Sequence, residues 1–245
     1  MPEGPSILLM KEVLQPFAGA RITNARGNAK IDMGVLKGKK LIEIKTFGKQ
    51  TFLVLDTVSV RIHLLMFGSY SVNEQTKPDK SLRLALFFKT GAMYFYTCAI
   101  RLVENAFLET IDWKADVLGS DWDAGHARKK LKQLPDMMVC DALLEQDVFS
   151  GVGNIIKNEV LFRIGVQPES LVGSLPSTKL NAVITEARNY SFEFLEWKRA
   201  FVLKQHWLVH TKRICPKCGA QLVKKYTGKT KRRSFYCTTD QRLYN

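Results

Sequence analysis

Residues 143–159 read Leu-Leu-Glu-Gln-Asp-Val-Phe-Ser-Gly-Val-Gly-Asn-Ile-Ile-Lys-Asn-Glu. The pattern predicts an apolar helix that ends, a Gly-Val-Gly-Asn turn, and a second helix that begins at the turn. Glycines let the backbone approach another surface closely, and the free N–H groups at a helix start form an anion site. The side chain of Asn154 adds a donor there. A helix-turn-helix against a DNA backbone and a plain capped helical hairpin both fit this stretch.

The segments on either side of this stretch differ in the spacing of their apolar residues. An opening helix over residues 7–14 is followed by short alternating runs that are typical of strands, at residues 40–44, 51–55, 58–64, 82–88 and 93–97. So many short strands indicate a sandwich or a barrel. From residue 126 to about 204 the spacing is helical, with helices expected at 126–134, 138–146, 155–164, 177–188 and 192–197.

This order predicts a multidomain α+β fold with three parts. Residues 1–115 are expected to form an N-terminal β-sandwich with the opening helix, and residues 116–208 a helical domain. Residues 209–245 are basic and cysteine-bearing, and they are expected to form a small metal-stapled β-hairpin.

The charge points to a polyanionic partner. Lys plus Arg number 37 against 23 Asp plus Glu, a formal net charge of +14. Each phosphate that such a surface neutralises releases condensed counterions, so nucleic acid is the first expectation. A protein that is merely basic, or one that binds anionic lipid, has the same composition.

No apolar run is long enough for a membrane span, so we expect no membrane association. The start Met-Pro-Glu-Gly-Pro lacks the basic and apolar regions of a secretory signal. We therefore expect a cytoplasmic protein, associated with the nucleoid if the source is bacterial.

The N-terminus carries a possible nucleophile. Removal of Met1 would expose Pro2, a secondary amine that can attack the anomeric carbon of a sugar and form an iminium. An α-amino group has a lower pKa than a lysine, about 8 against about 10.4, so more of it is unprotonated at neutral pH. Glu3 could move protons during the same reaction, although a carboxylate at a helix start is also favoured by the helix dipole.

The cysteines indicate a metal site. An odd number of five argues against a disulfide framework. Cys215 and Cys218 form a Cys-x-x-Cys pair, and Cys237 follows after a basic segment. Asp240 stands where a fourth cysteine is expected, and a carboxylate can ligate zinc, so we predict structural Zn²⁺ at these four residues. His210 is an alternative fourth ligand, and a metal-free hairpin is the other alternative.

In this order the elements resemble the formamidopyrimidine-DNA glycosylase and endonuclease VIII family. The markers are the Met-Pro-Glu-Gly-Pro start, Gly48-Lys49, the run His63-Leu64-Leu65-Met66-Phe67-Gly68, the Gly151-Val152-Gly153-Asn154 turn and the segment from Arg232 to Gln241. Any one of these markers is weak evidence, but five in the correct order are strong evidence. The resemblance covers essentially the whole chain. The resemblance implies an N-terminal β-sandwich, a helix–two-turn–helix DNA-binding domain and a finger-like hairpin.

The resemblance also implies roles for single residues. Pro2 resembles the nucleophile, Glu3 the acid and base, and Lys49 the lysine that assists β-elimination and contacts phosphate. Asn154, in the turn after Gly153, and Arg232 resemble the pair that holds the phosphates flanking a lesion. Enzymes of this kind flip the damaged nucleotide out of the stack, and Leu65, Met66 and Phe67 occupy the position that fills the hole.

Residues 96–102 lack the Arg- and Phe-bearing loop of the formamidopyrimidine branch. In this respect the chain is more similar to endonuclease VIII, whose usual substrates are oxidised pyrimidines. The implied function is a bifunctional DNA glycosylase and AP lyase of base excision repair that acts on damaged double-stranded DNA as a monomer, by β,δ-elimination.

Two residues depart from the family pattern. Ser6 stands where a second N-terminal glutamate is usual, and Asp240 replaces a cysteine. Ser6 leaves a second function open, a catalytically weakened protein that binds lesions or abasic sites.

Overall fold

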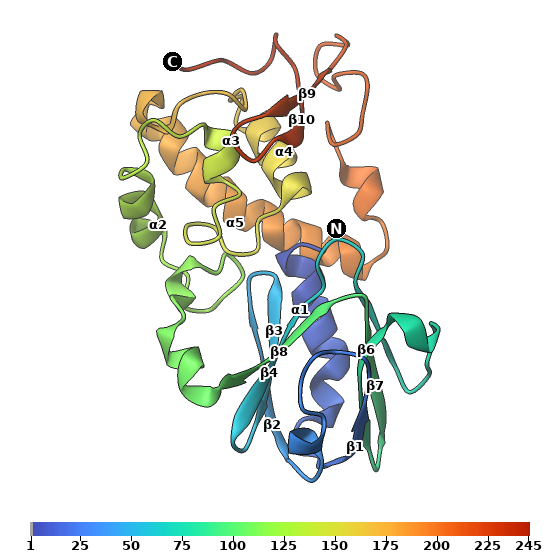
Figure 1. Cartoon of the computed structure of the whole chain (residues 1–245). Helices are drawn as coiled ribbons and strands as arrows, with labels where there is room; N and C mark the ends of the chain where they lie inside the picture. The colour runs from blue at the N-terminus through green and yellow to red at the C-terminus, as the bar shows by residue number, and fades with distance from the viewer. Residues whose placement is uncertain (1) are drawn as a thin grey trace. The chain divides into compact units, whose positions relative to one another are not determined.

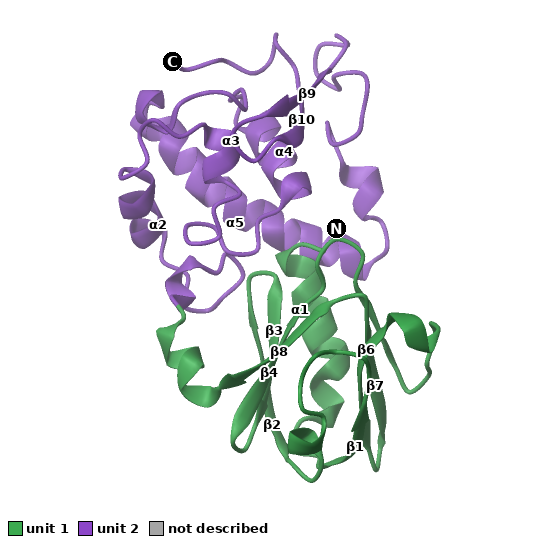
Figure 2. Cartoon of the chain, viewed as in Figure 1, with its two compact units in different colours: residues 1–111 green, residues 112–245 purple. Residues whose placement is uncertain are grey.

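The computed structural model describes residues 2–245 and separates the chain into two compact units, Met1–Ile111 and Asp112–Asn245 (Figures 1 and 2). The predicted three-part division at residues 115 and 208 stays a prediction.

Unit 1 is built from one long helix and two antiparallel sheets (Figure 1). The sheets have the strand orders β1-β6-β7-β5 and β2-β3-β4-β8. The elements are α1 (Gly4–Leu14), β1 (Ile22–Arg26), β2 (Leu41–Phe47), β3 (Gln50–Leu55), β4 (Val58–His63), β5 (Ser69–Val72), β6 (Leu82–Phe88), β7 (Gly91–Tyr96) and β8 (Ala99–Glu104), with short 3-10 helices at Gln15–Phe17, Gly34–Leu36, Asp79–Ser81 and Asn105–Thr110.

The core of unit 1 joins α1 to both sheets. Ile7, Met10 and Leu14 recur at helical spacing on one face of α1 and are fully buried. They share one apolar cluster with residues of both sheets, among them Leu53 and Phe95. Each Å² of apolar surface removed from water stabilises the fold by about 25 cal/mol. Burial of this face is therefore the main reason why α1 is held against the sheets.

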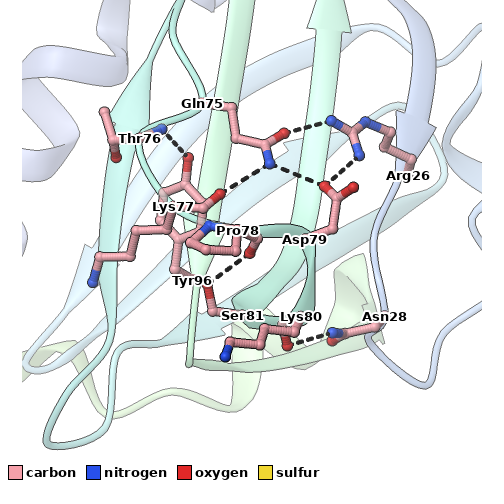
Figure 3. Close-up of polar contacts among 10 residues, drawn as sticks. All are labelled: Arg26, Asn28, Gln75, Thr76, Lys77, Pro78, Asp79, Lys80, Ser81 and Tyr96. Carbon is pink, nitrogen blue, oxygen red and sulfur yellow. Dashed lines mark hydrogen bonds and ion pairs between the residues drawn. The ribbon is translucent and has the colours of Figure 1, made fainter.

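The loop between β5 and β6 is held by polar contacts (Figure 3). The carboxylate of Asp79 accepts hydrogen bonds from Arg26 and Gln75, both at 2.9 Å. The backbone N–H of Thr76 donates to the hydroxyl of Tyr96 at 3.0 Å. These contacts give the loop a defined conformation although it lies on the surface.

Unit 2 is helical and ends in a hairpin. Its elements are α2 (Ala124–Leu131), α3 (Val139–Ala142), α4 (Asn154–Arg163), α5 (Ser177–Arg199), β9 (Val223–Thr227) and β10 (Arg232–Tyr236), with short 3-10 helices at Trp113–Ala115, Val172–Ser174 and Leu203–His206. Its main core gathers buried residues of α2, α3, α4 and α5. A second cluster joins Phe162 of α4 to the hairpin residues Leu222 and Phe235.

The predicted α+β fold, with an opening helix, N-terminal sheets, a helical region and a C-terminal hairpin, is confirmed. Three strands were not predicted: β1, β5 and β8. Each lies at the edge of a sheet, and none shows a regular alternation of burial. Pairing with a neighbouring strand forms such strands where the local pattern is weak.

Several predicted helices of unit 2 were wrong in extent. The helix expected over 138–146 ends at Ala142, and the side chain of Gln146 bonds the backbone of the turn at Gly151 and Val152. The helices expected at 177–188 and 192–197 are one helix, α5. The hydroxyl of Ser191 donates to the carbonyl of Ala187 at 2.6 Å, so this polar residue is accommodated inside the helix.

No helix among residues 2–245 is both long enough and apolar enough to cross a membrane.

Candidate functional site

The N-terminal residues lead directly into α1. Pro2 is half-buried, and Glu3 is the buried residue at the helix start, with extended backbone. Its carbonyl accepts from the N–H of Ser6 at 2.8 Å. Met1, whose removal the prediction for Pro2 requires, lies outside the described residues.

Lys49 lies in a two-residue turn between β2 and β3, since Phe47 pairs with Gln50. The turn needs Gly48, whose φ is +54°. Gln50 in turn pairs with His63 at the end of β4. In Figure 1 this turn and the start of α1 lie at the same end of unit 1, and α1 contacts both β2 and β3.

His63 is a functional candidate that the predictions did not assign. Burial lowers the pKa of its imidazole, and the charges of Lys49 and Arg61 lower it further. A neutral ring can accept a hydrogen bond, and its Nδ1 accepts one from the N–H of Leu65 at 3.0 Å. His63 therefore fixes the start of the turn that follows. Its place immediately before the Leu-Leu-Met-Phe run is the signal that could have identified it.

The turn from Leu64 to Gly68 presents the three apolar residues that the resemblance picks out. Leu65 and Met66 are each 49% exposed and Phe67 is 77% exposed. A hydrogen bond closes the turn, in which the N–H of Gly68 donates to the carbonyl of Leu64 at 2.8 Å. A Cβ on Gly68 would lie 2.1 Å from that carbonyl oxygen, so the turn requires glycine. The strand had been expected to continue to Leu64, but β4 ends at His63 and leaves the apolar side chains in solvent.

A pocket of about 300 Å³ lies beside this turn, lined by Arg61, His63, Leu65, Ala99 and Arg101. Arg61 and Arg101 are directly opposite each other on β4 and β8. Burial lowers the pKa of the Arg61 guanidinium, and the charge of Arg101 lowers it further. Like charges held together in this way favour an anionic ligand.

In unit 2, Asn154 is the first residue of α4 and Gly153 precedes it as the cap. The turn before them needs Gly151, whose φ is +100°. The side chain of Gln146 donates to the carbonyl of Val152 at 3.1 Å and accepts from the N–H of Gly151 at 3.2 Å. This places the start of α4, with its outward N–H groups, next to an ordered turn.

Arg232 is exposed at the start of β10. The side-chain amide nitrogen of Asn154 donates to the carbonyl of Arg233, the residue after Arg232, at 3.0 Å. The side chain of Asn154 thus contacts the residue that follows Arg232, so the two predicted phosphate-binding residues belong to neighbouring segments of one unit. Further exposed basic residues surround them on the hairpin: Lys224, Lys225, Lys229, Lys231 and Arg233.

The helix α4 also carries a polar run, Lys157-Asn158-Glu159, that is buried in full. The carboxylate of Glu159 accepts from the backbone N–H groups of Leu208, Val209 and His210 at 2.7 to 3.0 Å. Burial raises the pKa of Glu159, while these hydrogen bonds act in the opposite direction. These residues were not predicted as important; three consecutive polar residues inside an apolar helix are the signal that was available.

Cys215, Cys218, Cys237 and Asp240 form one group whose donor atoms all lie within 4.8 Å of one another. The Sγ of Cys215 is 3.0 Å from Oδ2 of Asp240, and the sulfurs of Cys218 and Cys237 are 3.5 Å apart. Four such donors fit a tetrahedral cation, with zinc–sulfur bonds of about 2.3 Å. The group could therefore hold a metal.

His210 does not belong to this group. Its Nδ1 lies 3.1 Å from the amide nitrogen of Asn158, and its ring packs against Phe235. Burial, followed by the charge of Lys157, lowers the pKa of His210 to about 4. The structure therefore favours Asp240 over His210 as the fourth donor.

Two family models match the chain. The formamidopyrimidine-DNA glycosylase N-terminal domain matches residues 1–103, and the formamidopyrimidine-DNA glycosylase H2TH domain matches residues 115–198. Together they cover the N-terminal sheets and the helical region.

The relatives carry related names. Endonuclease 8-like 3 of Xenopus laevis is 26% identical over 98% of this chain, which spans only 41% of that protein's length. Endonuclease 8 2 of Mycobacterium tuberculosis is 28% identical over 99% of this chain and 100% of that protein. The solved structure of the Lactococcus lactis formamidopyrimidine-DNA glycosylase, bound to DNA with an AP site, has a TM-score of 0.86 at 20% identity, covers 98% of this chain and 99% of its own, and shares the fold.

The structure thus distributes the predicted residues over the two units. Pro2, Glu3, Lys49 and the turn from Leu64 to Gly68 belong to unit 1. Gly153, Asn154, Arg232 and the four donor residues belong to unit 2.

Proposed function

The chain belongs to the formamidopyrimidine-DNA glycosylase and endonuclease VIII family, and we propose that it is a bifunctional DNA glycosylase and AP lyase of base excision repair. One observation carries the proposal beyond family membership. Gln50 follows Lys49 in the chain and pairs with His63 across β3 and β4. His63 in turn orders the exposed apolar turn that follows it, because its ring accepts a hydrogen bond from the N–H of Leu65. A cationic lysine beside an exposed apolar wedge suits an enzyme that unstacks DNA and acts on its backbone.

The proposed chemistry begins at Pro2. Once Met1 is removed, the amine attacks C1′ of the damaged nucleotide, the bond from C1′ to the base breaks, and the base leaves with that electron pair and a proton. Opening of the sugar ring gives an iminium between Pro2 and C1′. Glu3 is the proposed proton carrier for these steps.

The iminium then makes the proton on C2′ acidic. Loss of this proton expels the 3′ phosphate with the electron pair of the C3′–O bond. A second elimination, with loss of a proton from C4′, expels the 5′ phosphate with the electron pair of the C5′–O bond, so that a gap remains in the strand. Lys49 is proposed to assist the first elimination and to contact phosphate. Hydrolysis of the remaining iminium returns the free amine of Pro2.

DNA is the proposed partner, held by contacts to its phosphates. Asn154, the Gly153 backbone and Arg232 are proposed to bind phosphates that flank the lesion, and Leu65, Met66 and Phe67 to fill the space of the flipped nucleotide. The exposed fractions of these three side chains and the basic hairpin support this assignment. We propose that the protein acts as a monomer, in the compartment that holds its DNA, the cytoplasm and nucleoid in a bacterial cell.

The experiment that tests the function is base release from duplexes carrying thymine glycol, dihydrouracil, 8-oxoguanine or an abasic site. We expect release of the oxidised pyrimidines, strand cleavage to β,δ-elimination products, and a covalent adduct after borohydride reduction. Tight binding to abasic DNA without release of any base would contradict the proposal and support the lesion-binding alternative that Ser6 raises.

For the hairpin we propose structural zinc at Cys215, Cys218, Cys237 and Asp240. Zinc would supply the folding free energy that a small two-stranded hairpin lacks. Metal analysis of the purified protein is expected to find about one zinc per chain. Cys237→Ser should lower this content and destabilise the hairpin, whereas Cys98→Ser, at a buried cysteine of unit 1, should leave it unchanged. Folded, active protein without metal would contradict the assignment.

A further inference from the structure

The hairpin is tied to the helices of unit 2 at two points, one on each side of Arg232. The first point is the turn between β9 and β10. The carboxylate of Asp141, which is 8% exposed on α3, accepts from the N–H of Lys229 at 2.7 Å and from the N–H and hydroxyl of Thr230 at 3.1 and 2.7 Å. A carboxylate with three donors is a strong anchor, because hydrogen bonds to charged groups are about twice as strong as neutral ones.

The second point is the carbonyl of Arg233. Three side chains of α4 donate to it: Asn154 at 3.0 Å, Lys157 at 3.3 Å and Asn158 at 3.3 Å. The ammonium of the fully buried Lys157 also donates to the hydroxyl of Ser234 at 2.8 Å. One face of α4 therefore fixes the strand immediately after Arg232.

The shape of the turn agrees with the first anchor. Gly228 has a φ of +68°, and a Cβ at this position would lie 2.3 Å from Oδ2 of Asp141. Lys231, directly before Arg232, has a φ of +46°, which is unfavourable for a residue with a side chain. A two-stranded hairpin is only marginally stable by itself, so contacts outside the hairpin must hold this conformation.

Resting on the proposed function, we infer that Asp141 is a positioning residue for DNA binding. Acting through Lys229 and Thr230, it holds the backbone of Arg232 between two anchors, so that the guanidinium is presented to a DNA phosphate in one orientation. Such a device lowers the conformational entropy that the arginine loses on binding. Asp141 itself need not touch DNA.

The test compares Asp141→Ala with Arg232→Ala and with the double variant, in the full-length protein. The ligand is a duplex with an uncleavable abasic analogue, titrated over a range of salt concentrations. We expect each single variant to weaken binding about tenfold and to reduce the salt slope by about one, as for the loss of one phosphate contact. The double variant should bind within about twofold of Arg232→Ala, because both changes remove the same interaction.

Three further measurements keep the inference falsifiable. Asp136→Ala, at an exposed aspartate before α3, is the matched control and should bind as the wild type does. Hydrogen exchange of the Lys229 and Thr230 amides should accelerate in Asp141→Ala. Gly228→Ala breaks the same contact from the hairpin side, so it should reproduce the loss of affinity if Asp141→Ala folds poorly.

The outcomes are distinct. Faster exchange with unchanged affinity, or single effects that multiply in the double variant, would overturn the positioning role while the proposed function stands. Wild-type protein that neither binds the duplex nor releases a base would refute the proposed function, and this inference with it.

Discussion

Protein that retains Met1, or whose N-terminus is otherwise blocked, is expected to release no damaged base and to form no adduct with abasic DNA after borohydride reduction. The reason is that a blocked nitrogen in place of the free Pro2 amine cannot form the iminium on which base release and both eliminations depend. We expect a loss on the order of 1,000-fold or more, as for removal of a covalent nucleophile. Cleavage of a thymine glycol duplex and gel detection of the trapped complex are the measurements.

The comparison needs protein of the same fold and the same affinity. Mass spectrometry of the N-terminus establishes which preparation begins at Pro2. Both preparations should bind an uncleavable abasic duplex to similar extents, because the proposed phosphate contacts of Asn154 and Arg232 are unchanged. Pro2→Gly is unsuitable as the main variant, since glycine also provides an N-terminal amine. Full activity from protein with a proven block would show that another group is the nucleophile.

Glu159→Ala is expected to destabilise unit 2 by about 3–5 kcal/mol, because three backbone N–H groups lose their acceptor. Its carboxylate lies in α4 and accepts from three consecutive N–H groups of residues 208–210. Without it these donors have no carboxylate to bond, and each buried donor left unsatisfied costs about 1–3 kcal/mol. A folded domain has only about 5–15 kcal/mol of stability in total, so the change removes a large fraction of it.

Thermal or urea unfolding measures the loss, and hydrogen exchange locates it. The amides of Leu208, Val209 and His210 should exchange much faster in Glu159→Ala, while those of the sheets in unit 1 should change little. Glu196→Ala is the matched control, because Glu196 lies on α5 with its side chain 65% exposed and pairs only with Arg199 among the ion pairs of the described chain. Surface changes of this kind are usually within about 0.5 kcal/mol. A Glu159→Ala protein as stable as this control would show that the carboxylate does not support the segment.

Local apolar patterns in the sequence predicted much of the fold. The strands at residues 51–55 and 82–88, and the helix at 155–164, were predicted within one residue of their observed ends. Alternating or helical apolar spacing was enough there, because the side chains that form the core also form the pattern. The edge strands β1, β5 and β8 were missed, since an edge strand depends on pairing more than on its own periodicity.

Local patterns in the chain predict the order of the parts, the turn at Gly151–Asn154 and the four possible metal donors, because glycine geometry and short Cys-x-x-Cys spacing are local properties. Which polar groups form hydrogen bonds across long stretches of chain follows from the folded structure. Asp141 bonds a turn 88 residues further along the chain, and Lys157 bonds a serine 77 residues away. No local pattern names such partners. A buried polar group must find a hydrogen-bonding partner, but which one it meets depends on how the helices and the hairpin pack.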